Sequence, residues 1–98
     1  MVRHYIILIR FTDQGIRNVK DTTTRADAER SEAERIGGKF TSYGTIGKYD
    51  GIGILEAPNE EAAIEFELKV GSWGNVRTNA TLKAFAQEED ARVVDKLS

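Results

Sequence analysis

Hydrophobic residues follow two different periods along the chain, and the changes between them outline its secondary structure. Residues 4–12, HYIILIRFT, are rich in β-branched and aromatic side chains and predict a strand. Neighbouring residues of a strand point to opposite faces. Tyr5 and Ile7 then share one face, and Ile6 and Leu8 share the other, so both faces are apolar. We therefore expect a central strand that is covered on both sides.

The segment that follows changes to a helical period. Thr12 or Asp13 is expected to cap a short first turn, and Asp21 or Thr22 to cap a longer helix. This helix is expected to end at Gly37-Gly38, because glycine takes the left-handed conformation without steric cost. Steps of three and four residues predict an inward face made of Ile16, Val19, Thr23, Ala26, Arg30, Ala33 and Gly37.

The second half of the chain predicts a hairpin, a helix and a last strand. Strands are expected over residues 39–47 and 51–57, with a glycine-framed turn between them. A helix is expected after Pro58, with Asn59 as its N-cap. Residues 76–85 alternate as a fourth strand. Strict alternation places Arg77, Asn79, Thr81, Lys83 and Phe85 on one face and Val76, Thr78, Ala80, Leu82 and Ala84 on the other.

This order of elements, β-α-β-β-α-β, is typical of the ferredoxin-like fold of the α+β class, an antiparallel four-stranded sheet with both helices on one face. We expect a single domain over residues 1–98, with a core at about 4–86 and a tail at 87–98 that forms a short helix or frays. The other sheet face would be an exposed apolar patch, which usually marks an interaction surface. We therefore expect a homodimer or higher homo-oligomer, with sheets packed as a dimeric α+β barrel that has room for a ligand.

Composition narrows the function classes. The 98 residues contain no cysteine and one histidine, His4, so neither a thiolate nucleophile nor a metal site is expected. No nucleotide-binding fingerprint is present, and no cofactor is expected. Fourteen basic and 16 acidic residues give a net charge of −2 without a basic stripe, which argues against nucleic-acid binding. The longest apolar run, residues 5–9, is too short to span a membrane, and we expect a cytoplasmic protein.

Three segments resemble the GYD domain family: FTDQGIRNVKD (11–21), GGKFTSYGTIGKYDGIGILEAPNEEAA (37–63) and GNVRTNATLKAF (74–85). The resemblance implies a ferredoxin-like, dimeric α+β-barrel protein and no settled activity. The positions it points to are Thr12, Asp13, Gln14, Gly15, Gly47, Tyr49, Asp50, Asn75, Arg77 and Thr78. The Gly-x-Tyr-Asp turn and GNVRTNATL are also similar to the effector-binding domain of feast/famine regulators, which oligomerises and binds amino acids at subunit contacts.

Six residues are candidates for ligand binding: Thr12, Gln14, Tyr49, Asp50, Asn75 and Arg77, with Asn75 included on the resemblance alone. Asp50 has the chemistry of a general base, and Tyr49 that of a hydrogen-bond donor. An aspartate in a hairpin also fixes a turn by accepting hydrogen bonds from backbone N–H groups. Thr12 either binds a ligand or caps a helix, whereas capping explains Gln14 less easily.

Arg77 and Trp73 also have open alternatives. Arg77, with Arg10 on the first strand, either clamps a carboxylate or phosphate or pairs with Glu56 or a second subunit. Trp73, between glycines, is either a lid, an intersubunit anchor or a cover for the end of the second helix.

These residues support two functions. The first is a homo-oligomer that binds a small polar metabolite in the barrel or at a subunit contact. The alternative is a cofactor-independent isomerase, lyase or monooxygenase that uses Asp50 or Tyr49 as acid or base. The lack of a nucleophile and of paired catalytic carboxylates favours binding. Convergence of Asp50, Tyr49 and Arg77 or Arg10 on one cavity would favour the enzyme.

Overall fold

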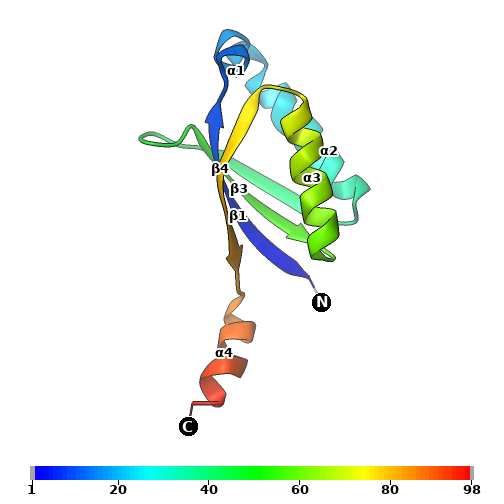
Figure 1. The fold of residues 1–98 in the computed structure, drawn as a ribbon, viewed down its shortest axis with the longest axis vertical. Coiled ribbons are helices and arrows are strands. Elements are labelled where there is room, and N and C mark those ends of the chain that lie inside the picture. Colours follow the sequence, from blue (N-terminus) through cyan, green and yellow to red (C-terminus); the bar gives the residue numbers. More distant parts are fainter. Residues whose placement is uncertain (1, 98) are drawn as a thin grey trace.

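A computed structural model describes residues 2–97 of the chain (Figure 1). Its elements are β1 (Arg3–Phe11), α1 (Asp13–Arg17), the 3-10 turn η1 (Val19–Asp21), α2 (Thr22–Arg35), β2 (Lys39–Gly44), β3 (Gly51–Ala57), α3 (Glu60–Ser72), β4 (Val76–Ala84) and α4 (Gln87–Asp95). The strands form one antiparallel sheet in the order β2-β3-β1-β4, and α2 and α3 cover the same face. The predicted ferredoxin-like fold is therefore confirmed.

The helix boundaries follow local capping signals in the sequence. At the start of α1, Thr12 Oγ1 accepts a hydrogen bond from the backbone N–H of Gly15 at 3.1 Å. At the start of α3, Asn59 Oδ1 accepts one from the N–H of Ala62 at 2.8 Å. Gly37 follows α2 with a φ of 81°, in the left-handed region that glycine tolerates. These three predicted boundaries are confirmed.

The hydrophobic core lies between the sheet and the two long helices. Its buried residues are Tyr5, Ile7, Ile9, Ala33, Phe40, Leu55, Ala57, Ala63, Phe66 and Val70. The rings of Phe40 and Phe66 pack with centroids 4.9 Å apart. Gly53 of β3 makes room for this pair, since a Cβ there would lie 2.3 Å from the Phe40 ring. The packing of the Phe40 and Phe66 rings therefore requires a glycine at position 53.

The face of α2 that meets the sheet differs from the predicted one. Arg30, which was expected to point inward, is exposed and pairs with Asp27. The buried residues of α2 are Glu29, Glu32 and Ala33. The prediction carried one helical period through from Ile16, but the chain is divided here into α1, η1 and α2, so the phase is lost. Asp21 occupies the N-cap position of α2 without making a capping hydrogen bond.

A β-bulge interrupts the pairing of β4 with β1. Leu8 pairs with Ala80, whereas the next residue of β1, Ile9, pairs with Thr78, so Asn79 is an extra residue in β4. A bulge of this kind shifts the alternation of side chains by one position. Strict alternation therefore assigns the residues on one side of the bulge to the wrong face of the sheet.

The predicted shared face of Arg77, Asn79 and Lys83 is consequently wrong. Arg77 pairs with Arg10 on the sheet face away from the helices. Beyond the bulge, Lys83 lies on the helix side, where its Nζ is 2.8 Å from Glu60 of α3. Lys83 therefore holds α3 and is not part of a basic group with Arg77.

The sheet face away from α2 and α3, called the open face below, is apolar. Cross-strand neighbours form two rows on it, Tyr43–Ile52–Leu8–Ala80 and Thr41–Ile54–Ile6–Leu82. Leu82 is 51% exposed, and Ile54 and Tyr43 are also exposed. An unpartnered apolar face of this kind was predicted from the first strand, and it is confirmed. Its burial against a second copy stays a prediction.

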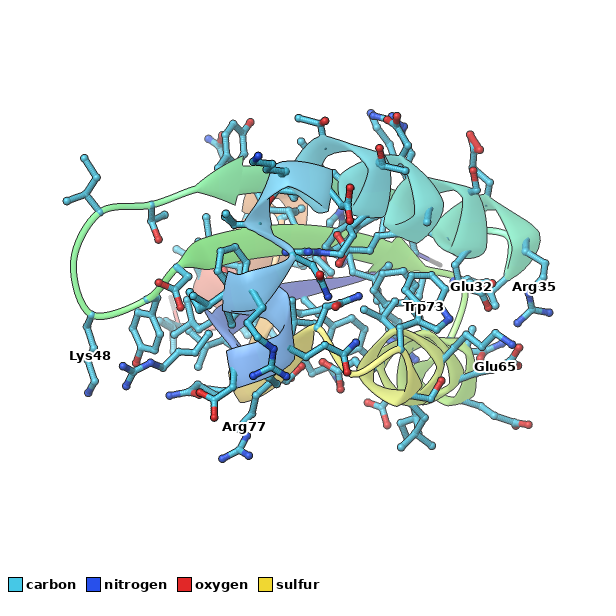
Figure 2. The ribbon with its side chains drawn as sticks, turned by 90° about the horizontal axis from the view of Figure 1, so that it is seen from above. Glu32, Arg35, Lys48, Glu65, Trp73 and Arg77 are labelled. Carbon is cyan, nitrogen blue, oxygen red and sulfur yellow. The ribbon has the colours of Figure 1, made fainter. Side chains whose placement is uncertain are left out.

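Two segments project from the sheet. The loop between β2 and β3, residues 45–50, extends beyond the sheet, with Lys48 at its outer bend (Figure 2). Its Ile46 is fully exposed. Helix α4 continues past the end of β4 and lies at the opposite end of the molecule from α1 (Figure 1). The molecule is therefore elongated, with extents of 53 × 30 × 17 Å.

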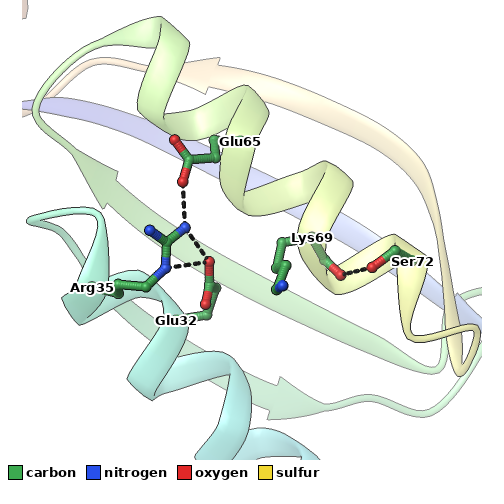
Figure 3. Close-up of polar contacts among 5 residues, drawn as sticks. All are labelled: Glu32, Arg35, Glu65, Lys69 and Ser72. Carbon is green, nitrogen blue, oxygen red and sulfur yellow. Dashed lines mark hydrogen bonds and ion pairs between the residues drawn. The ribbon is translucent and has the colours of Figure 1, made fainter.

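An ion-pair cluster joins the two long helices. Arg35 donates hydrogen bonds to Glu32 Oε1 at 2.9 and 2.6 Å and also pairs with Glu65 of α3 (Figure 3). The hydrogen bonds from Arg35 lower the pKa of Glu32, and Lys69 adds a weaker effect in the same direction. This cluster fixes α2 against α3.

Candidate functional site

A cavity of about 80 Å³ lies between α2 and the sheet and is called the α2 cavity below. Ile9, Phe11 and Val76 provide apolar lining. Arg25 and Glu29 line it from α2. Further lining comes from Ser42, Tyr43 and Gly44 of the edge strand β2 and from Asp50. The cavity therefore combines apolar lining with three ionisable side chains.

Glu29 is the unusual member of this cavity. Its residue is only 8% exposed, yet no side chain or backbone group within residues 2–97 donates a hydrogen bond to its carboxyl group. Burial raises the pKa of Glu29 above its usual value, and the positive charge of Arg25 offsets only part of that effect. The carboxyl oxygens of Glu29 are not among the fully buried unpartnered side-chain atoms of residues 2–97, which are His4 Nδ1 and Tyr5 Oη, so they reach solvent through the cavity.

Arg25 does not neutralise Glu29 directly. Its guanidinium donates hydrogen bonds to the backbone carbonyls of Asn18 at 2.7 Å and Gly15 at 3.4 Å. Its Cζ lies 5.4 Å from the centre of the Phe11 ring, at cation–π distance. Arg25 thus holds α1 and α2 together, and no ion pair to Glu29 forms within the described part of the chain.

Asp50 lies at the edge of the same cavity, but one of its carboxylate oxygens is already occupied. Oδ2 accepts a hydrogen bond from the backbone N–H of Phe11 at 2.8 Å. The N–H of Asp50 donates to the carbonyl of Ile9 at 2.9 Å, and its carbonyl accepts from the N–H of Thr45 at 3.2 Å. Asp50 therefore fastens the β2–β3 loop to the end of β1, which is a longer-range contact than the local turn expected from the sequence.

Tyr49 is half-buried and lies beside Lys48, whose Nζ is 5.7 Å from the centre of the Tyr49 ring. The carbonyl of Tyr49 accepts a hydrogen bond from the hydroxyl of Thr45 at 2.7 Å. Asp50 lines the α2 cavity, which Tyr49 does not line. Tyr49 and Asp50 therefore do not line the same cavity.

Thr12, Gln14 and Asn75 form a hydrogen-bonded brace between α1 and the loop after α3. The Thr12 hydroxyl donates to the carbonyl of Gly74 at 2.6 Å, and its N–H donates to the carbonyl of Asn75 at 3.1 Å. Gln14 Nε2 donates to Asn75 Oδ1 at 3.1 Å and to the carbonyl of Trp73 at 3.2 Å. Trp73 itself is half-buried and packs against the core. These contacts give the three candidates a structural role.

Arg77 lies on the open face and borders a recess that also includes Arg10, Thr12, Asp13, Gln14 and Asn79, called the basic recess below. Figure 2 shows Arg77 pointing away from the body of the molecule. Neither Arg77 nor Arg10 makes an ion pair within residues 2–97. Asp50 and Arg77 border different depressions, so the convergence on which the enzyme hypothesis depended is not seen among these residues.

Arg25 and Glu29 were missed because the charged residues of this segment were assigned to a solvent-exposed helix face. The signal was nevertheless present in the spacing of Thr22, Arg25, Glu29, Ala33 and Ile36, which follow steps of three and four residues. Within residues 2–97, no group of three His, Cys, Asp or Glu side chains is placed to hold a metal ion. None of the helices described is both long and apolar enough to cross a membrane.

Comparisons with known proteins agree with the fold. A model of the GYD domain family matches residues 5–94. A solved structure titled "Structural Genomics, protein YJCS" superposes with a TM-score of 0.63, covering 89% of this chain and 100% of its own, at 12% sequence identity. At that identity the likeness concerns the fold alone. None of the curated proteins matches the sequence.

Proposed function

The chain belongs to the GYD domain family, and we propose that it is a homodimer that binds a small polar metabolite in the α2 cavity of each protomer. The observation that carries the binding proposal is the carboxyl group of Glu29, which belongs to a largely buried residue, lines the α2 cavity and accepts no hydrogen bond within the described chain. A ligand that donates a hydrogen bond would supply the missing partner.

The chemistry of the lining defines the ligand class. Glu29 and Asp50 are acidic, while the guanidinium of Arg25 is committed to backbone carbonyls. An anionic group would meet two carboxyl groups, so the cavity favours a neutral or cationic donor such as an amine, an amide or a hydroxyl. At about 80 Å³ the cavity holds a group of a few heavy atoms, since one water takes about 30 Å³ in the liquid.

Thermal unfolding in the presence of small probes tests this proposal. Ethylammonium chloride and acetamide are expected to raise the Tm, and sodium acetate at the same ionic strength is not, because ligands that bind only the folded state stabilise it. Glu29→Gln is expected to remove at least half of the ethylammonium effect. Glu34→Gln, at an exposed position on the same helix, is the matched control and is expected to keep it. Equal stabilisation by acetate, or an unchanged effect in Glu29→Gln, would contradict the proposal.

A specific observation also favours a second function, acid–base catalysis without a cofactor. A carboxyl group whose pKa is raised by burial holds its proton more strongly than a solvated one, which suits the transfer of a proton to a ligand. Glu29 then takes the role first assigned to Asp50, whose Oδ2 is held by Phe11. Incubation in D₂O of any molecule that co-purifies with the protein is expected to incorporate deuterium at carbon with the native chain and not with Glu29→Gln.

The homodimer proposal is supported by the open face. Its two apolar rows cross all four strands, and neither α2 nor α3 lies on that side. A 98-residue domain has a modest core, so burying this face against a second copy adds stability that the single chain lacks. The α2 cavity lies between α2 and the sheet, and two of its lining residues, Tyr43 and Ile52, also belong to the open face.

A further inference from the structure

We propose that α4 is an intersubunit arm that docks on the basic recess of the partner protomer. This inference rests on the homodimer proposed above and specifies the direction in which the two open faces meet. It assigns an occupant to the basic recess and a packing surface to α4.

Helix α4 has no packing surface of its own in the described chain. None of its residues is buried, and Val93, Val94 and Leu97 at its end are all more than half exposed. A nine-residue helix is only marginally stable in water without tertiary contacts. Its contact with the sheet is at its first turn, where Glu89 Oε1 lies 3.8 Å from His4 Nδ1. An apolar stripe on a projecting helix therefore calls for a partner surface.

The first turn of α4, which is the end nearest the sheet, is strongly acidic. Glu88, Glu89 and Asp90 occupy the first turn. At the far end of the same open face, Arg10 and Arg77 face each other across β1 and β4 without ion-pair partners. Asp13 is the single acidic residue of that recess, so the recess is basic overall. The two surfaces have complementary charges.

These two surfaces cannot meet within one protomer. Ala84, the last residue of β4, follows Arg77 by seven residue steps of extended chain, which corresponds to about 23 Å. Beyond Ala84 the chain leads away from the recess, because α4 and α1 lie at opposite ends of the molecule (Figure 1). Contact between α4 and the recess therefore requires a second copy.

Two open faces can pack with their strands in the same or in opposite directions, and the charges of α4 and of the basic recess favour one of these. If the strands of the two sheets run in the same direction, both acidic helices lie at one end and both arginine pairs at the other. If the strands run in opposite directions, the end of β4 lies over the start of the partner's β4, and α4 meets the partner's Arg10 and Arg77. A two-fold axis then forms this contact twice.

Charge reversal in two separate chains tests this arrangement. One chain carries Arg10→Glu and Arg77→Glu, and the other carries Glu88→Arg and Asp90→Arg. Each chain alone is expected to dimerise at least tenfold more weakly than the native chain, because like charges then meet at both contacts. In an equal mixture both contacts are again complementary, so native mass spectrometry is expected to show heterodimers at least tenfold above the two homodimers combined.

Other outcomes overturn the inference in distinguishable ways. A statistical mixture of the three dimers would mean that α4 and the recess do not touch across the dimer, and that the recess has another occupant such as a small anion. The same conclusion would follow if each charge-reversed chain formed homodimers as strongly as the native chain does. A native chain that stays monomeric at all concentrations would instead contradict the proposed homodimer itself. If the double variants fold poorly, Arg77→Glu with Asp90→Arg provides the same test with single substitutions.

Discussion

The carboxylate of Asp50 accepts a hydrogen bond of 2.8 Å from the backbone N–H of Phe11, which joins residues 39 positions apart in the chain. The bond connects the β2–β3 loop to the end of the central strand. At the same point the N–H of Asp50 donates to the carbonyl of Ile9. The most recognisable motif of the sequence therefore has a structural role in this fold, and the unpaired acidic group of the neighbouring cavity is Glu29.

Asp50→Ala removes the acceptor for the N–H of Phe11. A hydrogen bond to a charged group contributes about 1.5–3 kcal/mol, and Asp50 is half-buried, so we expect a loss of about 1–2 kcal/mol in the free energy of unfolding. Asp50→Asn keeps an oxygen acceptor and is expected to lose less. Urea unfolding measures both. An unchanged urea midpoint for Asp50→Ala would show that the contact does not hold the loop.

Glu29→Gln is expected to stabilise the protein at neutral pH and to have less effect in acid. The pKa of Glu29 is raised in the folded state, so its contribution is most favourable below the unfolded-state pKa and is lost as the pH rises through the folded-state pKa. A gain of 1 kcal/mol corresponds to a Tm increase of about 4–8 °C for a domain of this size. Calorimetry at pH 4 and pH 7, with Glu34→Gln as control, measures the difference. A gain that is larger at pH 4 would contradict the assignment.

Arg35→Met removes the ion pairs that join α2 to α3. Its effect on stability is expected to have the opposite dependence on pH. Hydrogen bonds from Arg35 lower the pKa of Glu32, so the stabilisation is present above the unfolded-state pKa of that carboxyl group and is lost as the pH falls through the folded-state pKa. We expect a small decrease in Tm at pH 7 that disappears in strong acid. The pair is largely exposed on the arginine side, so 1 M salt is also expected to reduce the effect. A deficit that persists unchanged at low pH would argue against this origin.

Gly53→Ala tests the close contact beneath the aromatic pair of the core. A Cβ at this position would lie 2.3 Å from the Phe40 ring, so the ring must move. Overpacking of this kind costs about 1–3 kcal/mol. Gly44→Ala is the matched control, because no atom lies within 4 Å of its added Cβ. Equal urea midpoints for the two variants would mean that Phe40 adapts without cost.

Leu82→Lys tests the homodimer. The side chain of Leu82 is in the apolar rows of the open face, so a lysine there is expected to convert dimers to monomers in light scattering. Leu68→Lys is the control: Leu68 is 70% exposed, more than Leu82, but it lies on α3. A monomeric native chain, or equal effects of the two substitutions, would count against an interface on the open face.

Much of the fold was readable from the sequence because its signals are local. Asn59 marks the start of α3 by its own hydrogen bond, and Gly37 marks the end of α2 by its own backbone angle. The apolar character of both faces of β1 also follows from alternation alone. These features depend on a few neighbouring residues, which is why the element order and these helix boundaries could be predicted, whereas β2 ends at Gly44 and not at residue 47 as expected.

Features that depend on contacts between distant segments could not be predicted in this way. The bulge at Asn79 arises from the pairing of β4 with β1, and strict alternation cannot reveal it. The phase of α2 depends on where η1 interrupts the chain. In the sequence, Glu29 cannot be distinguished from the charged residues on the exposed face of the same helix. Its burial follows only from the packing of α2 on the sheet. Of the residue pair Tyr49 and Asp50, only Asp50 borders the α2 cavity, and ligand binding by the predicted site residues stays a prediction.

The central claim is that the carboxyl group of Glu29 contacts the ligand. Carbon-13 NMR of that carboxyl group tests it most directly, by titration of the labelled protein with ethylammonium chloride and, separately, with sodium acetate. We predict a saturable shift of the Glu29 carboxyl resonance with ethylammonium and none with acetate. A Glu29 resonance that stays in place while ethylammonium moves other signals would contradict the claim.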